Sequence, residues 1–218
     1  MHTYKGTSFA EAYQKSLIDL MDNGDLCETR GTTSRELLNV SLEITDPSQC
    51  MYTNMTRSTQ AKYIAAEFLW YYAGRNDVAF ISKYAKFWEQ IQNPNGTANS
   101  AYGNLIFKPK SLGGITQYEW AIASLAKDKD SRQAILHFNT PEHQYSGNKD
   151  FVCTMYGIFH IRHNKLHFSV YMRSNDAIWG TPTDVAFFCS LQMQAFAHLK
   201  EFYPELELGS YTHHANSY

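Results

Sequence analysis

The chain has 218 residues, 44% of them hydrophobic, and a formal net charge of -2 from 19 basic and 21 acidic side chains. This length supports one sizeable hydrophobic core and is short for two, so we expect a single domain over residues 1–218. The near balance of charge argues against broad electrostatic binding to nucleic acid, although a local group of arginines can still bind one or two phosphates.

The four cysteines are widely scattered, at Cys27, Cys50, Cys153 and Cys189. They form no CxxC pair and no Cys/His group at zinc spacing, so we expect a reduced protein without a metal site. The N-terminus lacks the basic and apolar blocks of a signal peptide, and no apolar run approaches the roughly 18 residues that span a bilayer. These features predict a cytoplasmic protein with no membrane partner.

The first predicted elements are a helix and a strand. Apolar residues at helical spacing predict an amphipathic helix over residues 8–21, with Ser8 placed to cap it and Glu11 to complete a capping box. A Gly/Thr-rich loop carrying Arg30 follows. Alternating apolar residues over 38–44 then predict a strand.

The next stretch, residues 59–73, predicts a helix that is apolar over most of its surface and has Glu67 in its middle. Glu67 either occupies the one wet face, pairs with a base, or transfers protons, because a buried carboxylate costs several kcal/mol unless it is paired or protonated. Residues 78–91 predict a second helix carrying Trp88, a residue type that more often packs in a core than binds a ligand. A Pro/Gly/Asn loop over 93–104 follows.

Residues 115–128 predict a further helix, and residues 133–139 predict a strand. Ser131 and Arg132 therefore fall at a helix-to-strand junction, from which side chains can reach outward. The sequence contains no Gly-x-x-x-x-Gly-Lys-[Ser/Thr] or Gly-x-Gly-x-x-Gly loop, which argues against a kinase or a dehydrogenase.

The last part of the chain predicts a β-hairpin, a helix and a final strand. The hairpin strands cover 152–161 and 165–172, a long helix starts near Asp184 and runs to about residue 200, and residues 205–218 form the strand. In this arrangement Asp184 has the ordinary role of a helix N-cap. Strands and helices mix without βαβ regularity, so the predicted class is α+β.

Five motifs follow one another in an order and spacing that resemble the thymidylate synthase superfamily, from about Arg30 to the end of the chain. They accompany a cysteine on a strand, Cys153, and are EFLWYYAG at 67–74, Tyr102-Gly103, DSR at 130–132, RSND at 173–176 and GTPTDVA at 180–186. The resemblance implies a thymidylate-synthase-like domain with a mixed β-sheet and flanking helices. Members of the family carry out transferase chemistry in nucleotide biosynthesis.

By this resemblance Cys153 is the nucleophile. A strand cysteine is more often a buried inert thiol. Arg173 and Ser174 are expected beside Cys153, and a nearby guanidinium lowers a thiol pKa and raises the fraction of reactive thiolate. The flanking motifs therefore favour the nucleophile.

The resemblance also implies a phosphate site made of Arg30, Arg132, Arg173 and Ser174. A guanidinium suits that task because its planar fork can make two charged hydrogen bonds at once. In the family the residue corresponding to Arg132 reaches across from a second subunit, so a homodimer is expected. The family commonly has two consecutive arginines here, whereas Gln133 follows Arg132 in this chain.

Asp184 bears on the choice of base. Family members that use dUMP usually carry asparagine here, because an amide can donate to the uracil carbonyl and accept from N3–H. Cytosine instead offers an amino donor that a carboxylate accepts. The RSND motif together with Asp184 is most similar to the deoxycytidylate hydroxymethylase branch of the family, which occurs in phages. If the protein is encoded by a phage, the expected location is the cytoplasm of the host.

The family mechanism implies that Cys153 adds to C6 of the pyrimidine and that C5 then takes a one-carbon unit from 5,10-methylenetetrahydrofolate, the expected co-substrate. Glu67 relays protons through water, and Tyr102 helps to order the site. Positions near the folate are matched by Trp88, Asp176 and Gly180.

Two products are possible, because addition of water gives a hydroxymethyl group and hydride transfer from the folate gives a methyl group. Ile91 replaces the second tryptophan of methylating members, Met172 replaces their glutamine before Arg-Ser, and Thr154 replaces their histidine after the nucleophile. All three departures favour the hydroxymethylase. Thymidylate synthase, a dCMP methyltransferase, or a nucleotide- or RNA-binding member without turnover remain the alternatives.

Family members continue into a His-x-Tyr motif that contacts the sugar and a terminal segment that closes over the folate. The printed sequence stops just before that motif is due, so we expect the domain either to lack it or to receive its functions from elsewhere. His213 and His214 do not align with the motif and are expected to be surface or strand residues.

Overall fold

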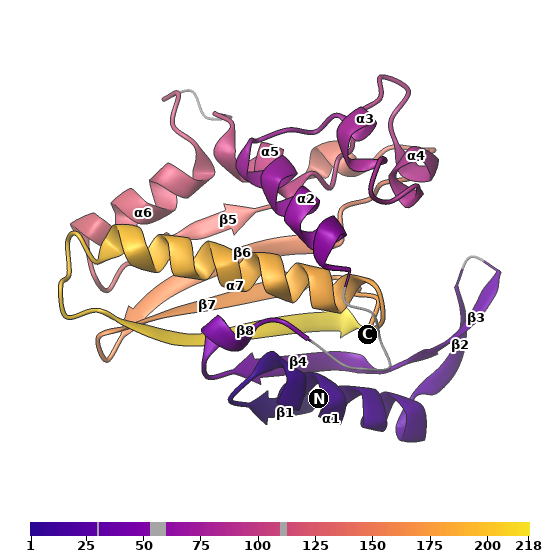
Figure 1. Ribbon diagram of the computed structural model, residues 1–218, viewed down its shortest axis with the longest axis horizontal. Coiled ribbons are helices and arrows are strands. Elements are labelled where there is room, and N and C mark those ends of the chain that lie inside the picture. The colour runs from indigo at the N-terminus through magenta and orange to yellow at the C-terminus, as the bar shows by residue number, and fades with distance from the viewer. Residues whose placement is uncertain (30, 53–59, 110–112) are drawn as a thin grey trace.

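The centre of the molecule is a six-stranded mixed β-sheet (Figure 1). The computed structural model describes residues 1–29, 31–52, 60–109 and 113–218. In spatial order the strands are β1 (His2–Gly6), β4 (Leu38–Ile44), β8 (Glu207–Ser217), β7 (Lys165–Met172), β6 (Thr154–Arg162) and β5 (Ile135–His137). β1 is parallel to β4 and β7 to β8, whereas the other neighbours are antiparallel. The predicted α+β class with a mixed sheet is confirmed.

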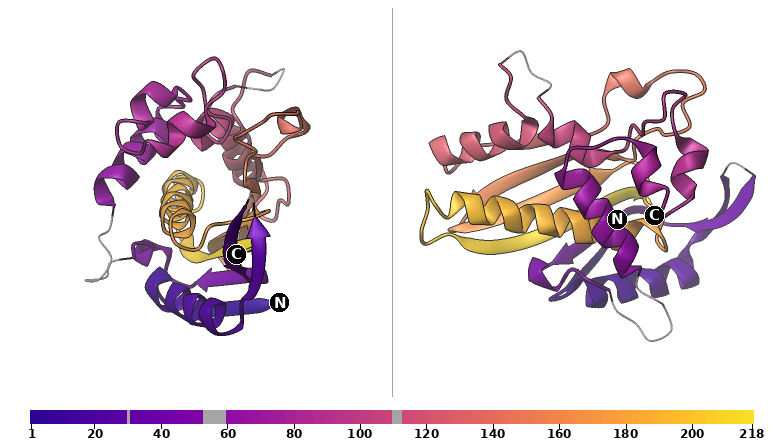
Figure 2. Two further views of the ribbon diagram at one scale, coloured as in Figure 1. Left: turned by 90° about the vertical axis from the view of Figure 1, so that its right-hand side faces the viewer. Right: turned by 45° about the horizontal axis from the view of Figure 1, so that its top comes forward.

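Helices cover one face of this sheet. The longest, α7 (Gly180–Leu199), runs along the sheet and lies between it and α2 (Ala61–Tyr72), as the left view of Figure 2 shows. The remaining helices are α1 (Phe9–Asn23), α3 (Val78–Ile81), α4 (Phe87–Ile91), α5 (Tyr102–Phe107) and α6 (Gln117–Lys127), with 3-10 turns at Pro47–Gln49 and Pro141–His143. A separate hairpin of β2 (Asp25–Thr29) and β3 (Thr32–Glu36) extends away from the sheet (Figure 1).

One polar side chain fixes α7 on the sheet. The pairing of β7 with β8 shifts register between Leu166 and Phe168. The buried Gln192 of α7 donates from Nε2 to the Leu166 carbonyl at 2.9 Å and lies 3.2 Å from the carbonyls of Gly209 and Ser210. Buried carbonyls need such partners, so the irregularity in the sheet is matched to one point on the helix.

The predicted first helix is confirmed, and its cap differs in one detail. Ser8 accepts a hydrogen bond from the Glu11 N–H at 3.3 Å, as expected of an N-cap. The Glu11 carboxylate, however, accepts from the Thr7 N–H at 2.8 Å rather than from that of Ser8. The hydrogen bond from the backbone to the Glu11 side chain therefore comes from the residue before the N-cap, one position earlier than in the predicted capping box.

Several predicted elements differ from those observed. The helix expected over 78–91 is broken into α3 and α4, and the intervening turn brings Tyr84 to Lys86 to the wall of the main cavity. The loop expected over 93–104 contains the start of α5. Part of the loop expected around Arg30 forms the β2–β3 hairpin, whose exposed second strand lacks apolar alternation, and β1 was not predicted.

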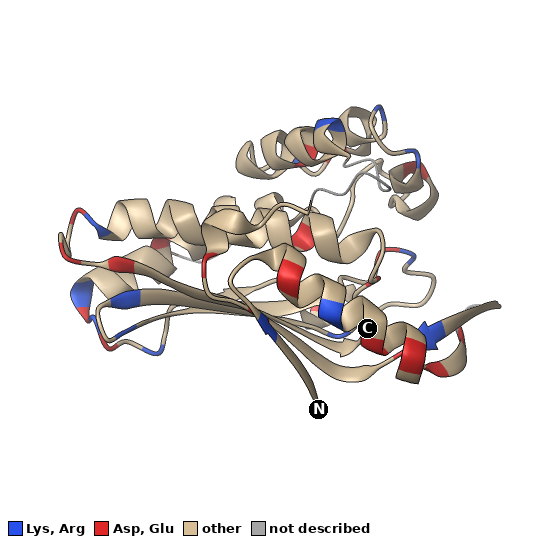
Figure 3. Ribbon diagram, turned by 60° about the horizontal axis from the view of Figure 1, so that its bottom comes forward, with Lys and Arg blue, Asp and Glu red and all other residues tan. Residues whose placement is uncertain are grey.

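Charged residues are distributed over the turns and the outer helices, with acidic and basic positions interspersed (Figure 3). This agrees with the small net charge of the chain. Among the described helices, none has both the length and the apolar character needed to cross a bilayer.

Candidate active site

A cavity of about 940 Å³ lies at the end of α7 where the loop before β6, the loop after β7 and α2 meet. Apart from Arg30 and Arg132, every predicted site residue lines it: Glu67, Trp88, Tyr102, Cys153, Arg173, Ser174, Asp176, Gly180 and Asp184. Residues separated by more than a hundred positions in the sequence therefore share one site. Arg30 lies outside the described residues.

Cys153 directly precedes β6, at a bend rather than within the predicted strand. Its Sγ lies 3.3 Å from Nη2 of Arg173 and 3.8 Å from Oγ of Ser174, both of which donate to it. Burial raises the pKa of the Cys153 thiol, and Arg173 and Ser174 offset only part of that rise. The expected lowering of the pKa is therefore wrong as a net direction, because desolvation outweighs the nearby guanidinium.

Arg173 also organises the loop that holds the thiol. Its guanidinium donates to the Phe151 carbonyl at 2.6 Å and to the Val152 carbonyl at 3.3 Å, and it lies 5.0 Å from the centre of the Phe151 ring. Nη1 donates to Oγ of Ser174 at 3.1 Å. This guanidinium and hydroxyl present adjacent donors beside the sulfur, an arrangement that suits an anionic oxygen.

Glu67 is buried on α2, with 5% of its surface exposed. Its Oε1 accepts a hydrogen bond from the Tyr63 hydroxyl at 2.5 Å and from the Tyr71 hydroxyl at 3.3 Å. Burial, followed by the charge of Asp184, raises the pKa of Glu67 to about 8, although the two tyrosines oppose this. Within the part of the chain that the structure describes, neither a wet face nor a basic partner explains Glu67, so a role in proton transfer fits its surroundings best.

Asp184 lies inside α7, because this helix begins at Gly180 and not near Asp184. The N-cap reading is therefore wrong. Its Oδ2 accepts from Nδ2 of Asn175 at 2.7 Å, and its carboxyl also hydrogen-bonds with Tyr102. Burial raises the pKa of Asp184 to about 7, so this carboxyl exchanges its proton near neutral pH.

Gly180 allows the start of α7 to lie against Asn175. A Cβ at Gly180 would sit 2.9 Å from Nδ2 of Asn175, closer than such contacts allow. A side chain here would push the amide away from Asp184. The glycine of the Gly-x-Pro turn thus serves the position of the carboxyl.

Tyr102, the first residue of α5, is buried and stacks on Tyr71 with ring centres 5.3 Å apart. Its hydroxyl accepts from Oγ1 of Thr154 at 2.9 Å and hydrogen-bonds with Asp184. A Cβ at Gly103 would lie 1.7 Å from the Tyr71 carbonyl oxygen. The Tyr-Gly pair is therefore a packing requirement: glycine lets α5 approach α2, and the tyrosine then reaches Asp184.

The outer part of the cavity has aromatic walls, which suit a flat heteroaromatic ring such as a pterin. They come from Tyr84, Phe87, Trp88 and Trp179. Nε1 of Trp88 donates to the Tyr63 hydroxyl at 3.1 Å, so this indole is coupled to Glu67. Asp176 faces the same space, although its Oδ1 accepts from the Ile178 and Trp179 N–H groups, at 2.9 and 2.5 Å. These residues fit a folate.

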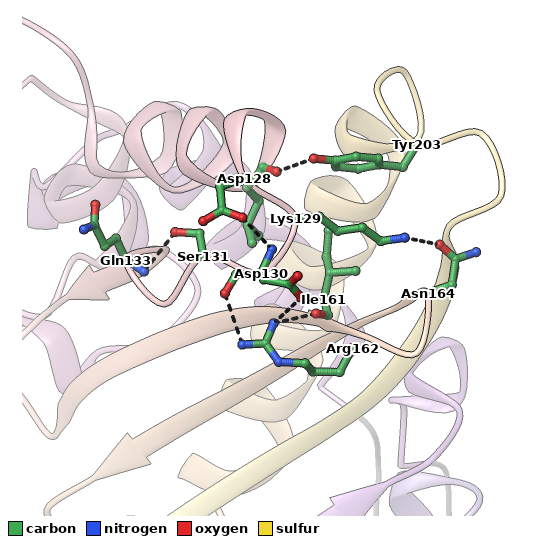
Figure 4. Close-up of polar contacts among 10 residues, drawn as sticks. Asp128, Lys129, Asp130, Ser131, Gln133, Ile161, Arg162, Asn164 and Tyr203 are labelled. Atoms are coloured by element: carbon green, nitrogen blue, oxygen red, sulfur yellow. Dashed lines mark hydrogen bonds and ion pairs between the residues drawn. The ribbon is translucent and has the colours of Figure 1, made fainter.

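Arg132 is exposed on the loop between α6 and β5 and does not line the cavity. The predicted helix-to-strand junction is thus confirmed. The loop is fastened to the β6–β7 hairpin: Arg162 donates to the Asp130 carbonyl at 3.2 Å and Lys129 to the Asn164 side chain at 2.8 Å (Figure 4). Arg132 is therefore an exposed residue of an anchored loop and lies outside the cavity that holds this chain's own thiol.

Two residues that contact the site were not predicted from the sequence: Tyr63, which lines the cavity, and His213, which lies behind it. His213 and His214 lie on β8, as expected, but His213 is 1% exposed and is not a surface residue. Its Nε2 lies 2.9 Å from Oδ1 of Asn175. The alternation of the last strand places positions 211, 213 and 215 on its buried side, which is the signal that identifies His213.

Within the described ranges, no three histidine, cysteine or carboxylate side chains converge in a way that could hold a metal ion. The site is instead defined by a thiol, the buried carboxyl of Glu67 and the partly buried carboxyl of Asp184, both with raised pKa values, and an arginine. Such a combination is typical of acid–base and nucleophilic catalysis on a small anionic substrate.

A family model described as thymidylate synthase matches residues 11–216, and the chain belongs to that family. It is 30% identical over 195 residues to the deoxyuridylate hydroxymethyltransferase of Bacillus phage SP01, covering 83% of this chain and 50% of that protein. It is 35% identical over 130 residues to the deoxycytidylate 5-hydroxymethyltransferase of Enterobacteria phage T4, covering 57% and 52%. The chain thus spans about half the length of these curated relatives.

The fold has a counterpart of known structure. The thermostable thymidylate synthase A from Bacillus subtilis superimposes with a TM-score of 0.77 at 24% identity, over 97% of this chain and 79% of that one. At this identity the likeness shows the fold. The expected thymidylate-synthase-like fold is thereby confirmed.

Proposed function

We propose that this protein transfers a one-carbon unit from 5,10-methylenetetrahydrofolate to C5 of a pyrimidine nucleoside monophosphate, with dCMP as substrate and 5-hydroxymethyl-dCMP as product. The observation that carries this proposal is the shared cavity of Cys153, Arg173 and Asp184. A thiol nucleophile, a phosphate ligand and a carboxyl group for the base edge then occupy one space.

The carboxyl of Asp184 suits cytosine because its pKa is about 7. In the protonated form, its O–H can donate to N3 while its other oxygen accepts from the 4-amino group. When the sulfur of Cys153 bonds to C6, the electron pair of the C5–C6 double bond moves to C5. Transfer of the Asp184 proton to N3 at that point stabilises the adduct, in which the ring nitrogen is more basic.

Arg173 and Ser174 are proposed to hold the phosphate and to keep Cys153 in place for attack. Arg173 already donates to the sulfur and to the loop carbonyls beside it. A bound nucleotide replaces solvent around the thiol, so the guanidinium then acts at short range in a water-poor site. Arg30 and Arg132 are proposed as further phosphate ligands.

Glu67 is proposed to remove the C5 proton through water. Three observations support this role: the pKa of Glu67 is about 8, its carboxylate accepts a hydrogen bond from the Tyr63 hydroxyl, and the charge of Asp184 acts on it. The folate supplies the one-carbon unit at the methylene oxidation level. Trp88, Asp176 and Gly180 are proposed to line the space that holds it.

The hydroxymethyl product is supported by Ile91, which lines the cavity in place of the second tryptophan of methylating members. Loss of the C5 proton and of tetrahydrofolate, as the bond from the transferred carbon to the folate nitrogen breaks, leaves an exocyclic methylene on C5. Water then adds to that methylene, and the bond from Cys153 to C6 breaks as the C5–C6 double bond re-forms. The similar proteins of phages SP01 and T4 are both named hydroxymethyltransferases, which also supports this product.

A second candidate substrate is dUMP, since the relative from phage SP01 is named for it. A protonated Asp184 can donate to O4 of uracil and accept from N3–H, so the acid form fits both bases. Only cytosine requires a proton on N3, which Asp184 supplies. We therefore propose dCMP as the preferred substrate and dUMP as the second-best substrate.

The test is separate incubation of dCMP, dUMP and CMP with methylenetetrahydrofolate and mass spectrometry of the nucleotide. We expect a hydroxymethyl product from dCMP without formation of dihydrofolate. Dihydrofolate and a methyl product would instead show thymidylate synthase chemistry. A chain that binds dCMP but releases no C5 hydrogen from it would be a binding protein without turnover.

We also propose that residues 1–218 act as one domain within a homodimer, in which Arg132 serves the opposite site. Arg132 is exposed on an anchored loop and lies outside its own cavity, which supports this arrangement. Light scattering on the purified chain tests for the dimer, and mixed dimers of Cys153→Ser and Arg132→Ala subunits test whether Arg132 serves the opposite site.

A further inference from the structure

Three buried residues form a hydrogen-bonded chain from the last strand to the carboxyl of Asp184, the group proposed to read the base. The Tyr211 hydroxyl lies 2.8 Å from Nδ1 of His213, and Nε2 of His213 lies 2.9 Å from Oδ1 of Asn175. Nδ2 of Asn175 donates to Oδ2 of Asp184 at 2.7 Å. Tyr211, His213 and Asn175 are 0%, 1% and 6% exposed, so water does not compete for these bonds.

Because His213 is neutral, the hydrogen bonds of this chain run in one of two directions. Burial, helped by the neighbouring His214, lowers the pKa of His213 to about 3, so its ring is neutral at working pH. A neutral imidazole donates from one nitrogen and accepts at the other. When Nε2 donates to Asn175, Nδ1 accepts from Tyr211 and the amide N–H group of Asn175 points at Asp184.

The opposite direction is chemically complete as well. A ring protonated on Nδ1 would donate to Tyr211 and accept the amide N–H group of Asn175 at Nε2. The carbonyl of Asn175 would then face Asp184, and only a proton on Oδ2 of Asp184 could satisfy both oxygens. The two tautomers of His213 thus correspond to two orientations of the amide and two positions of the Asp184 proton.

Two neighbours hold Asn175 in the observed orientation. Oγ1 of Thr181 lies 2.6 Å from Oδ1 of Asn175 and donates to it, so the carbonyl oxygen has a second donor. The Asn175 backbone N–H donates to the Ser217 carbonyl at 2.8 Å, which fixes the residue beside β8. The amide is therefore held from both the helix and the strand.

We propose that His213 is a positioning residue for base recognition: its Nε2–H fixes the Asn175 amide, so that Oδ2 of Asp184 accepts and the exchangeable proton of Asp184 resides on Oδ1. This inference rests on the proposed function, since it assigns Asp184 to the base. It adds a residue of the last strand, which does not line the cavity, to the groups that determine which base is bound.

The polar and titratable groups around Asp184 are consistent with this role for Asn175. The bonds from Asn175 and Tyr102 lower the pKa of Asp184, whereas burial and the carboxylate of Asp176 raise it. Glu67, Cys153, Tyr63, Tyr71 and Tyr211 are the other titratable groups close enough for their ionisation to be coupled to that of Asp184. A carbonyl in place of the Asn175 N–H group would thus raise the pKa of Asp184 further.

The first test needs no substrate. Nitrogen-15 NMR of the histidines in the whole chain should show His213 neutral, protonated on Nε2 and not on Nδ1, from pH 6 to pH 8. His213→Leu and His213→Gln identify the signals. A ring protonated on Nδ1 would overturn the proposal, and this result does not depend on whether the protein turns over dCMP.

The second test follows Asp184 by carbon-13 NMR of its carboxyl, assigned with Asp184→Asn. His213→Leu should move its titration to higher pH, and His213→Gln, which retains a donor, should restore it. Thr181→Val removes the other donor to Asn175 and should act in the same direction if His213→Leu does not fold. An unshifted titration in His213→Leu and Thr181→Val would contradict the proposal.

The third test measures kcat/KM for dCMP and dUMP. His213→Leu should lower the ratio of kcat/KM for dCMP to that for dUMP about tenfold, which corresponds to the contribution of one hydrogen bond. His213→Gln should restore the ratio. His214→Gln is the matched control, because that ring lies on the other side of β8 and bonds Ser41 at 2.7 Å. An equal loss of kcat/KM for dCMP and dUMP in His213→Leu would indicate a structural role only and would refute base positioning. The two NMR tests need no turnover, so their results hold even if the proposed activity is wrong.

Discussion

The Tyr63 hydroxyl donates to Oε1 of Glu67 across 2.5 Å, within one turn of α2. The same hydroxyl accepts from the Trp88 indole at 3.1 Å. A buried carboxylate with a raised pKa is thereby connected to the aromatic wall of the cavity. Occupancy of that wall and the protonation of Glu67 are consequently linked through one phenol.

Replacement of Tyr63 by phenylalanine should shift the pH dependence of turnover. Glu67 accepts a proton only as a carboxylate, and its pKa is about 8, so activity rises with pH through that range. The Tyr63 bond lowers this pKa, and its loss should move the rising limb to higher pH. Measured kcat against pH checks this, with Tyr71→Phe, which loses a longer bond of 3.3 Å, expected to shift less.

Glu67→Gln should stabilise the protein at alkaline pH while abolishing turnover. The folded-state pKa of about 8 lies above the ordinary value of 4.5. The native state therefore binds more protons between these values, and the free energy of unfolding falls as pH rises through them. Glutamine removes this loss, which we expect to be on the order of a few kcal/mol at pH 9 and close to nothing at pH 4.

Urea unfolding of wild type and Glu67→Gln at several pH values measures this difference. Glu89→Gln serves as a control, since Glu89 is an exposed partner of Lys86. A difference between wild type and Glu67→Gln that grows toward low pH would be incompatible with a raised pKa in the folded state.

Asp184→Asn should change the preferred base from dCMP to dUMP. The amide cannot supply a proton to N3 of cytosine, but it can donate to O4 and accept from N3–H of uracil. We expect the ratio of kcat/KM values for dCMP over dUMP to fall at least about a hundredfold, the loss of one or two matched hydrogen bonds. Unchanged preference in a folded variant would remove Asp184 from base recognition.

Mixed subunits can test where Arg132 acts. Cys153→Ser and Arg132→Ala should each be inactive alone, because one lacks the nucleophile and the other a phosphate ligand. A mixed dimer combines an intact Cys153 with an intact Arg132 from the other subunit, so mixing followed by refolding should restore activity. Continued inactivity of mixed dimers, verified by mass spectrometry, would place Arg132 outside the neighbouring site.

Cys153→Ser should eliminate release of the C5 hydrogen from labelled dCMP without loss of nucleotide binding. Among the described residues, the side chains that hydrogen-bond to the sulfur, Arg173 and Ser174, both act as donors, so neither takes the proton from a serine hydroxyl at this position. Cys27→Ser, on the β2–β3 hairpin, is the matched control and should release the hydrogen as wild type does. Release by Cys153→Ser at the wild-type rate would exclude a covalent adduct.

Periodicity predicted the long elements well. The helices around Glu67 and after Asp184 and the hairpin of β6 and β7 follow from apolar spacing, because their buried faces are continuous in sequence. α5 was missed since it starts within an Asn/Gly-rich stretch and depends on Gly103 packing against α2. Tertiary contact, rather than local propensity, decides such a short helix.

The site was predicted less evenly. The order of the motifs identified Cys153, Arg173 and Asp184 as partners, and these line one cavity. The direction of the Cys153 pKa could not be predicted, because it depends on how much solvent the fold removes. The contact between His213 and Asn175 joins residues 38 positions apart, and nothing in the spacing of either residue indicates it.

The hydrogen bonds of Gln192 help to determine how deeply Asp184 extends into the cavity. Asp184 and Gln192 lie eight residues apart on α7, so a rigid rod of about two turns connects them. Gln192 fits only where the misregistered carbonyls of β7 and β8 converge, and the helix cannot slide along its axis without losing those bonds. The register shift at the far end of the sheet thus fixes the position of α7 along its axis, and with it the depth to which Asp184 extends into the cavity.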